Sequence, residues 1–589
     1  MIHLPGRLSY SRSRETLARS QVLRRTWPIM LDLFVAAIGL ACFYGVVRIA
    51  TLWMGHAEPQ MVISLAPGSL PKYAFFSIVR MSLAYFLSLA FAITYGYIAA
   101  YSQRFESLMI AGLDILQSIP VLSFLPGVML AMVALFPTRQ VGVELGAIIL
   151  IFTGQAWNIA FSFYSSLKSL PKELQEASTI YGFSRWQRFW QLELPYSAIG
   201  LIWNSMVSVA GGWFFLMACE MFVLGTRDFR LPGLGSYLQT AASQGNFPAM
   251  LWGIATMIAI VVATDQMIWR PMIAYSDLFK FEQSEGKARV RSPLLHALQH
   301  STASRAFSRK VIRPMNESLY RHFAKKRSSH PDDERPERTP TSRILRTVLF
   351  GLAILAIGYS ATRAVEMLRT VQAHQFLMIL EGAGATFLRV NLALLLASLW
   401  TIPVGVAIGF NPRLAKLAQP IAQVAASVPA TALFPILIVA LVRVGGGMGL
   451  AAILLMLLGT QWYILFNVIA GAMAIPTDML EVARLYRFTT LQKWQTVILP
   501  GIFPYLITGL LTASGGAWNA SIVAEYYHLK DHTLQTFGLG QQISSATDGG
   551  QFQLLLLATI VMAIMVVTVN RLVWRPLFRL SETKYKLGA

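Results

Sequence analysis

Charged residues are scarce in this chain of 589 residues: Asp, Glu, Lys and Arg make up 13% of it, against 55% apolar residues. Globular chains carry about 25% charged residues, so the composition excludes an ordinary soluble protein. Cysteine is nearly absent as well. Cys42 and Cys219 each lie inside an apolar run, which excludes a disulfide framework. No His, Cys or carboxylate cluster has metal-ligand spacing, so we expect no metal site and no catalytic residues.

A phosphate-binding loop for ATP is also missing. The pattern GxxxxGK[ST] occurs nowhere, and the pair Gly286-Lys287 lacks both the upstream glycine and the following Ser or Thr. We therefore expect no cofactor on this chain and no enzyme activity of its own. Any step driven by ATP would have to use another polypeptide.

The apolar residues form long runs, and the mean hydropathy of the chain is +0.53. A helix of roughly 20 residues crosses a bilayer, and the runs lack the alternation of an outer-membrane barrel. They predict an all-α polytopic membrane protein with six spans in each half. The expected spans are 28–53, 74–101, 108–136, 143–167, 197–225 and 249–273, then 344–364, 383–410, 414–442, 449–470, 501–527 and 552–573.

Basic residues give the chain a net charge of +21, and they cluster beside the spans. Residues 1–26 hold six Arg against one acid, and residues 277–343 hold 15 Lys or Arg against eight acids. Cytoplasmic segments of membrane proteins carry such an excess. We therefore expect both termini to be cytoplasmic. We also expect these charges to contact membrane lipid and not nucleic acid.

Four segments follow from these patterns: a basic tail (1–27), a first six-span domain (28–276), a basic linker (277–343) and a second six-span domain (344–589). Within the linker, residues 292–326 mix apolar and basic side chains. That mixture fits an amphipathic helix on anionic lipid, and it also fits a solvated tether.

The two domains are a tandem repeat. Two charged segments, here named the first island (170–195) and the second island (475–500), align at a spacing of 305, from Pro171 with Pro476 onward. Further upstream the spacing is 309, so that Arg80 matches Arg389. Such a duplication predicts two halves with parallel topology, packed about a pseudo-twofold axis with a pathway between them.

Each island reads as a short surface helix, a turn and a second helix. Pro171 and Pro476 suit the first turn of a helix. Glu176 and Glu481 would then be exposed and could contact a partner, or they could only solubilise an interfacial loop. A polar segment retained twice between spans favours a docking surface, because a plain connection could be shorter.

At the islands, the chain resembles the permeases of binding-protein-dependent ABC importers. Their coupling loop reads Glu-Ala-Ala, three residues, Gly, nine residues, Ile, one residue, Leu-Pro. The first island offers Glu176, Ala177, Gly182, Leu192, Leu194 and Pro195 at that spacing. The second offers Glu481, Ala483, Val497, Leu499 and Pro500, with Arg487 where the glycine belongs. Other segments resemble the nitrate, sulfonate, taurine and bicarbonate branch, and its fused, duplicated permeases most of all.

This resemblance implies a cytoplasmic coupling helix in each half and a bacterial inner-membrane location. It implies two copies of a separate cytoplasmic ATPase, which would hold ATP and Mg, and a periplasmic solute-binding protein. Arg487 departs from the pattern, since arginine pays about 1 kcal/mol or more where glycine adopts positive φ. Either the second turn has another geometry, or Arg487 reaches an acidic group on the ATPase.

Ionisable residues inside spans are suspects for the pathway by default. Arg80 and Arg389 could face an anionic solute, or they could snorkel or pair within the fold. Glu220 and Glu525 would repel an anion, so we favour a structural pairing of these acids, with the arginines as candidate partners. Pathway candidates of another kind are prolines: Pro120 and Pro429, together with Pro126 and Pro435, interrupt the third spans.

These features predict the permease of an ATP-driven importer that moves a small, anionic solute by alternating access. The alternatives are a 12-span secondary transporter driven by an ion gradient, and an ABC importer for a solute that is not anionic. The duplicated islands argue against the secondary transporter, which needs no ATPase.

Overall fold

A computed structural model of the chain describes residues 62–102, 105–136, 140–224, 227–276, 361–426, 428–443, 445, 447–529 and 532–584, with a few single residues between 310 and 359. The basic tail and the expected span 28–53 lie outside the described residues. So do most of the expected span 344–364 and nearly all of the linker, including the question of an amphipathic helix or a tether.

The first half is a chain of helices with one small hairpin. Its elements are α2 (Leu70–Tyr101), α3 (Glu106–Ser118), α4 (Leu125–Leu135), α5 (Val141–Lys168), α6 (Lys172–Ile180), α7 (Arg185–Arg188), α8 (Leu194–Glu220), β1 (Val223–Leu224), β2 (Arg227–Asp228), α9 (Leu234–Ser243), α10 (Phe247–Thr264) and α11 (Arg270–Ser276). Short 3-10 or π turns join some of them: η1 (Pro67–Ser69), η2 (Val121–Phe124), η3 (Phe189–Glu193) and η4 (Asp265–Trp269).

The second half repeats this order. Its elements are α16 (Ala373–Phe410), α17 (Pro412–Ala426), α18 (Ala430–Arg443), α19 (Met448–Ala474), α20 (Thr477–Leu485), α21 (Thr490–Lys493), α22 (Leu499–Ala524), β3 (Tyr526–Leu529), β4 (His532–Gln535), α23 (Leu539–Asp548), α24 (Phe552–Val569) and α25 (Arg575–Lys584). The π turns η7 (Trp494–Ile498) and η8 (Asn570–Trp574) fall at the places of η3 and η4. The predicted duplication is therefore confirmed element by element.

Among the described residues, eight helical segments are long and apolar enough to cross a membrane. They correspond to the second, fourth, fifth and sixth expected spans of each half. The predicted all-α polytopic architecture is confirmed, and its two hairpins are the only strands in the part of the chain that the structure describes.

Each expected third span is broken in two at a proline, as the sequence predicted. Ile119 is extended, with φ −79° and ψ 122°, because the ring of Pro120 excludes the helical region for the residue before it. Pro429 likewise stands in the gap between α17 and α18. Pro126 lies in the first turn of α4, where a missing amide removes no helical hydrogen bond, and α18 continues through Pro435. The prediction that these two prolines also interrupt the third spans is therefore wrong.

The fifth spans end earlier than expected. The sequence predicted spans to residues 225 and 527, but α8 ends at Glu220 and α22 at Ala524. A hairpin follows each of them, β1–β2 and β3–β4, both antiparallel. Apolar residues in the hairpins extended the hydropathic runs past the true helix ends.

Within each half, one central helix carries most of the packing. In the first half α2 and α8 pack on α5, and in the second half α16 and α22 pack on α19. Small residues let these helices approach closely: a Cβ on Gly409 would lie only 2.6 Å from the Cβ of Ala472.

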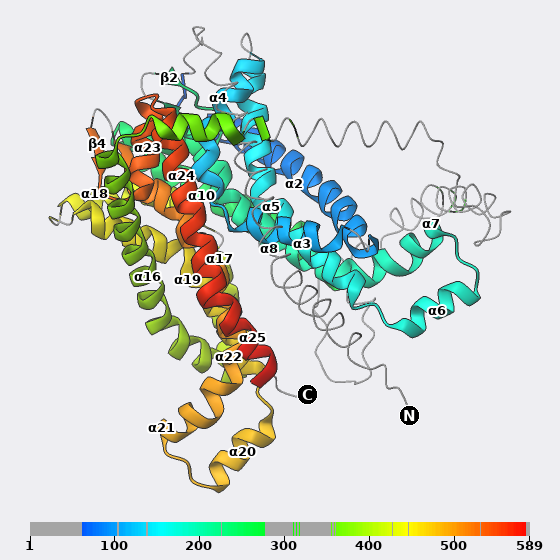
Figure 1. Cartoon of the computed structure of the whole chain (residues 1–589). Coiled ribbons are helices and arrows are strands. Elements are labelled where there is room, and N and C mark those ends of the chain that lie inside the picture. The colour runs from blue at the N-terminus through cyan, green and yellow to red at the C-terminus, as the bar shows by residue number, and fades with distance from the viewer. Residues whose placement is uncertain are drawn as a thin grey trace, which may run out of the picture.

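The two halves meet near the ends that carry the hairpins. Here α18 contacts α8 and α9, and η2 contacts α22. Two hydrogen bonds cross the boundary, from the Tyr527 hydroxyl to Gln239 Oε1 at 2.6 Å and from Thr559 Oγ1 to the Ser123 carbonyl at 3.4 Å. Figure 1 shows the halves joined at this hairpin end and both islands, α6–α7 and α20–α21, at the opposite end.

Candidate functional site

Each island begins with a helix whose N-cap is a proline. Pro171 precedes α6 and Pro476 precedes α20, one position before the first turn in which the sequence predicted them. Glu173 and Asp478 occupy the first turns, where the helix dipole favours an acid.

The acids predicted to contact a partner are exposed. The side chains of Glu176 and Glu481 both face solvent, and neither has a hydrogen bond or ion pair with another described residue. Their neighbours Ala177 and Ala483 lie deeper, the latter 3% exposed. Each first helix therefore presents a carboxylate while its small residue packs inward.

The turn after this helix has the same geometry in both islands. Gly182 has φ 61°, and its amide donates to the Thr179 carbonyl at 2.9 Å. The amide of the next residue, Phe183, donates to the Ser178 carbonyl. Arg487 has φ 50°, and its amide donates to the Arg484 carbonyl at 3.0 Å. Both are Schellman motifs with a left-handed residue at the same position. Of the two alternatives offered for Arg487, a different geometry of the second turn is wrong.

A second helix then leads from each island into a span. Ser184 caps α7 and Thr489 caps α21, each through a capping box with a glutamine three residues later. Leu194 and Pro195 open α8, and Leu499 and Pro500 open α22, after one π turn in each case. The Leu-Pro ends of the predicted motif thus mark where the islands continue into the fifth spans.

The islands are attached to the neighbouring span by different chemistry. In the first, Glu193 accepts hydrogen bonds from Arg188 at 2.8 Å and from the Tyr101 hydroxyl at 2.5 Å, at the end of α2. In the second, Lys493 lies over the ring of Phe410, 5.6 Å from its centre, at the end of α16. Ile498 replaces Glu193 at the spacing of 305, so only the first attachment contains a carboxylate.

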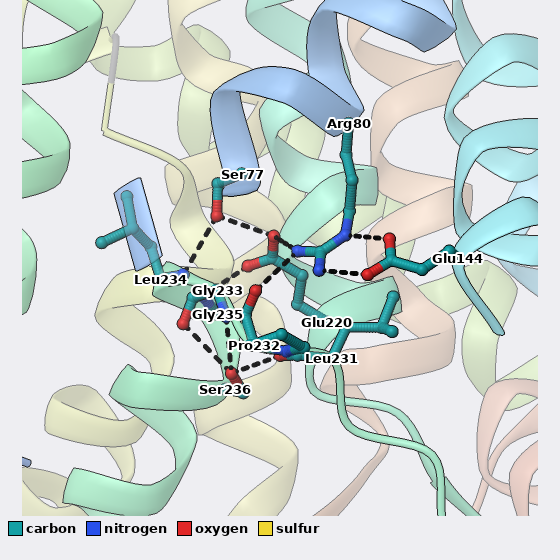
Figure 2. A network of polar contacts seen from close by, with 10 residues as sticks. All are labelled: Ser77, Arg80, Glu144, Glu220, Leu231, Pro232, Gly233, Leu234, Gly235 and Ser236. Carbon is teal, nitrogen blue, oxygen red and sulfur yellow. Dashed lines mark hydrogen bonds and ion pairs between the residues drawn. The ribbon is translucent and has the colours of Figure 1, made fainter. Parts of the chain in front are cut away.

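At the hairpin end, Arg80 joins three elements of the first half (Figure 2). Its Nη1 lies 2.8 Å from Glu220 Oε1 and 2.9 Å from the Pro232 carbonyl, and its Nη2 lies 2.7 Å from Glu144 Oε1. Arg80 is 3% exposed and Glu220 is fully buried. Ser77 also donates to the Glu220 carboxylate, at 2.7 Å.

Arg389 forms the equivalent cluster in the second half. Its Nη1 lies 2.8 Å from Glu525 Oε1, and Thr386 donates to the same carboxylate at 2.8 Å. Its Nη2 donates to Thr536 Oγ1 at 3.0 Å. The favoured pairing of Glu220 and Glu525 with the arginines is therefore confirmed in both halves.

Each buried glutamate also holds the start of the short helix that follows its hairpin. The amides of Gly235 and Gly540 donate to Glu220 and Glu525, both at 2.8 Å. A helix N-terminus favours a carboxylate in this position. Gly233 and Gly538 make the approach possible, because a Cβ on either would lie 2.3 Å from the carboxylate.

Several side chains of these clusters were missed from the sequence, among them Thr536, the second partner of Arg389. Glu144 lies inside the expected fourth span, where any acid is a functional suspect. Ser77 and Thr386 match at the spacing of 309, three residues before each arginine. Repeat-matched hydroxyls beside a repeat-matched cation were the signal that could have identified them.

A cavity of about 140 Å³ lies where the halves meet at the hairpin end. Pro126 and Met221 line it from the first half, and Ile522, Tyr526 and Tyr527 from the second. Burial raises the pKa of the Tyr527 phenol, which therefore remains the donor to Gln239.

A second, polar cavity of about 420 Å³ lies between α5 and α8 and is wide open to its surroundings. It is lined by Asn158, Phe161, Ser162, Ser165, Ser166, Ser169 and Asn204. The positions 305 residues later hold Tyr463, Phe466, Asn467, Ala470, Gly471, Ala474 and Gly509. The hydroxyl-rich surface is therefore a property of the first half alone.

Among the described residues no group of three His, Cys, Asp or Glu side chains could hold a metal ion. Cys219 is buried and free. The described site therefore consists of two exposed islands, two buried ion-pair clusters and the surfaces between the halves. Together they define a duplicated, polytopic helical membrane protein with two exposed islands at one end.

Residues 92–267 and 401–574 each match the family of binding-protein-dependent transport system inner membrane components. The two matches cover more than half of the chain, and each contains one island. The chain belongs to this family, which confirms the predicted resemblance.

Curated relatives come from the branch that the sequence predicted. The chain is 31% identical to the nitrate import permease protein NrtB of Leptolyngbya laminosa over 190 residues, which are 32% of this chain and 64% of that protein. It is 33% identical to the bicarbonate transport system permease protein CmpB of Synechococcus elongatus over 141 residues, 24% of this chain and 49% of that protein. It is 29% identical to the taurine transport system permease protein TauC of Escherichia coli over 188 residues, 31% of this chain and 64% of that protein. The chain thus spans about half to two thirds of the length of these relatives.

Proposed function

We propose that this chain is the permease of an ATP-driven importer in a bacterial inner membrane, with the islands and both termini on the cytoplasmic side. Its support is the exposed island built twice with one turn geometry, at the same end of both halves. Two ATPase subunits, which carry ATP and Mg, dock on the islands, and a periplasmic binding protein delivers the solute at the hairpin end.

Transport proceeds by alternating access between the halves. Each island continues through a π turn into a fifth span, so a displacement of the docked ATPase moves that span as a rigid lever. The first island is also hydrogen-bonded to the end of α2, where the Tyr101 hydroxyl donates to Glu193. Motion at the island end is thereby transmitted to helices whose other ends carry the buried ion-pair clusters.

The solute that we propose is a small oxyanion or an organic acid of similar size. Support comes from relatives named for nitrate, bicarbonate and taurine transport, and from the polar cavity between α5 and α8. Hydroxyl and amide donors can solvate an anion without holding it tightly, as passage requires.

In this proposal the two arginines do not bind the solute. Arg80 faces two carboxylates, and Arg389 faces one. A solute anion approaching either cluster would meet no excess positive charge. Arg80 and Arg389, with Glu220 and Glu525, therefore hold the mouth of the pathway in shape, and Pro120 and Pro429 place the broken third spans beside it.

The docking role is tested by reversing the charge of both exposed acids. Glu176→Arg combined with Glu481→Arg should abolish the co-purification of an ATPase with the chain from native membranes, and the purified chain alone should not hydrolyse ATP. Glu366→Arg is the matched control, since Glu366 is also exposed but lies outside the islands. Normal ATPase recovery with the double variant would exclude the islands as the docking surface.

A further inference from the structure

We propose that the second island binds an acidic surface of its ATPase through Arg484 and Arg487, and that the two islands hold their ATPases with unequal strength. This inference rests on the proposed docking function. It concerns the charge of the partner surface, which neither the family nor the relatives' names specify.

The first observation is a strained backbone. Arg487, at φ 50°, is the only non-glycine residue with positive φ in the described part of the chain. A side chain in this region costs about 1 kcal/mol or more relative to glycine. Gly182 shows that the same turn forms with glycine, at φ 61°. The turn itself therefore gives no reason for an arginine.

The second observation is that no described contact of the Arg487 side chain offsets this strain. The Arg487 side chain is exposed and makes no hydrogen bond or ion pair with another described residue. Residues kept in unfavourable backbone regions cluster at functional sites such as ligand clamps and switch regions. An exposed guanidinium with no internal acceptor is suited to a contact outside the chain.

The third observation is a second arginine beside the first. The side chain of Arg484, in the last turn of α20, is also exposed and also makes no hydrogen bond or ion pair with the described residues. The equivalent positions of the first island hold Thr179 and Gly182. At these two positions beside the turn the second island carries two cations and the first carries none, whereas the exposed Lys172 and Arg185 of the first island have threonines as their equivalents.

The apolar part of the docking surface does not differ in this way. Ile180 and Tyr181 of the first island are 84% and 74% exposed, and Leu485 and Tyr486 of the second are 80% and 76% exposed. Both islands therefore offer the same apolar anchor to a partner groove. The charge beside that anchor is what distinguishes them.

Carboxylates on the ATPase are the chemistry that complements paired arginines, because planar guanidinium groups bind carboxylates with two hydrogen bonds. Two identical ATPases would leave these carboxylates opposite Thr179 and Gly182 at the first island. The second island should then hold its ATPase more tightly, and that contact should weaken with salt.

The test compares retention of the ATPase by the purified complex from about 0.1 M to about 1 M salt, over which the Debye length falls from about 10 Å to about 3 Å. The wild-type complex is compared with three variants. Arg487→Gly removes the backbone strain and the charge, and Arg487→Asn removes the charge with a residue that tolerates positive φ. Arg487→Lys retains both the strain and the charge. The retained polypeptide is identified as an ATPase by its peptide masses and by ATP hydrolysis.

We expect Arg487→Gly to raise the thermal unfolding midpoint of the chain and yet weaken ATPase binding about threefold to tenfold at low salt. Arg487→Asn should weaken binding similarly, Arg487→Lys should do so less, and the difference from wild type should vanish at high salt. A Gly variant that retains the ATPase like wild type at every salt concentration overturns the inference. A wild-type chain that retains no ATPase contradicts the proposed function instead.

Discussion

Glu144 and Gly449 occupy the same position in the two halves, 305 residues apart, yet only Glu144 places a carboxylate on the neighbouring arginine. In the first half, Arg80 links α2 to both α5 and α8. In the second half, Arg389 pairs with one carboxylate, that of Glu525 just after α22. Its other guanidinium nitrogen, Nη2, donates a hydrogen bond to Thr536 Oγ1. The two clusters are related by the repeat but differ in charge.

This difference predicts unequal effects of removing the buried glutamates. Glu525→Gln takes the only described carboxylate from Arg389, and breaking a buried pair in this way costs about 3–5 kcal/mol. Glu220→Gln should cost less, because Arg80 retains Glu144. Thermal unfolding of the two purified variants in detergent checks this order, and equal losses would mean that Glu144 does not compensate.

An acid at position 449 should rescue the weaker cluster. A Cβ on Gly449 would lie 3.5 Å from Thr536 Oγ1, the atom that accepts a hydrogen bond from Arg389. We therefore expect Gly449→Glu to recover part of the stability lost in Glu525→Gln, with a coupling of about 0.5–3 kcal/mol in a double-mutant cycle. Gly449→Gln is the matched neutral control and should recover less. Equal rescue by both substitutions would assign the effect to packing instead of charge.

Balanced removal of charge separates a structural arginine from a solute ligand. Arg389→Gln alone leaves Glu525 buried without its cation and should destabilise the chain. Arg389→Gln with Glu525→Gln removes both charges and should restore most of the stability. Uptake of nitrate, bicarbonate and taurine should recover with it. A stable double variant that still fails to take up any of these solutes would instead indicate that Arg389 contacts the solute.

The glycine before α23 should tolerate no side chain. A Cβ on Gly538 would lie 2.3 Å from the Glu525 carboxylate, so Gly538→Ala forces the carboxylate or the helix aside at a cost of about 1–3 kcal/mol. Gly515→Ala is the control, because a Cβ on Gly515 would meet nothing within 4 Å. The measurement is the unfolding midpoint of each variant, and similar values for both would show that the cluster yields easily.

Local and periodic features of the sequence were sufficient for the general architecture. Long apolar runs predict membrane helices because an unpaired backbone is costly in lipid, and matched spacings of 305 and 309 predict two equivalent halves. The breaks at Pro120 and Pro429 were also predictable from the sequence, because a proline restricts the backbone of its immediate neighbours. The islands followed from their charge and from one motif retained twice.

The spans' ends and partners were less predictable. Hydropathy continues a few residues past both helix ends into the start of each hairpin, so it could not show that α8 and α22 stop at the buried glutamates. The carboxylates of Glu220 and Glu525 at these ends accept hydrogen bonds from the amides of Gly235 and Gly540, which lie 15 residues further along the chain. Periodicity carries no information about such contacts.

The sequence by itself determined the membrane class, the duplication and the islands, because each of these is written in residues that are close together or regularly spaced. Tertiary structure alone decided that Arg80 faces Glu144 as well as Glu220, across separations of 64 and 140 residues. It also decided that Arg487 adopts the conformation of Gly182. Charge balance in a buried cluster and backbone strain in a turn depend on what surrounds a residue, and only the folded chain sets those surroundings.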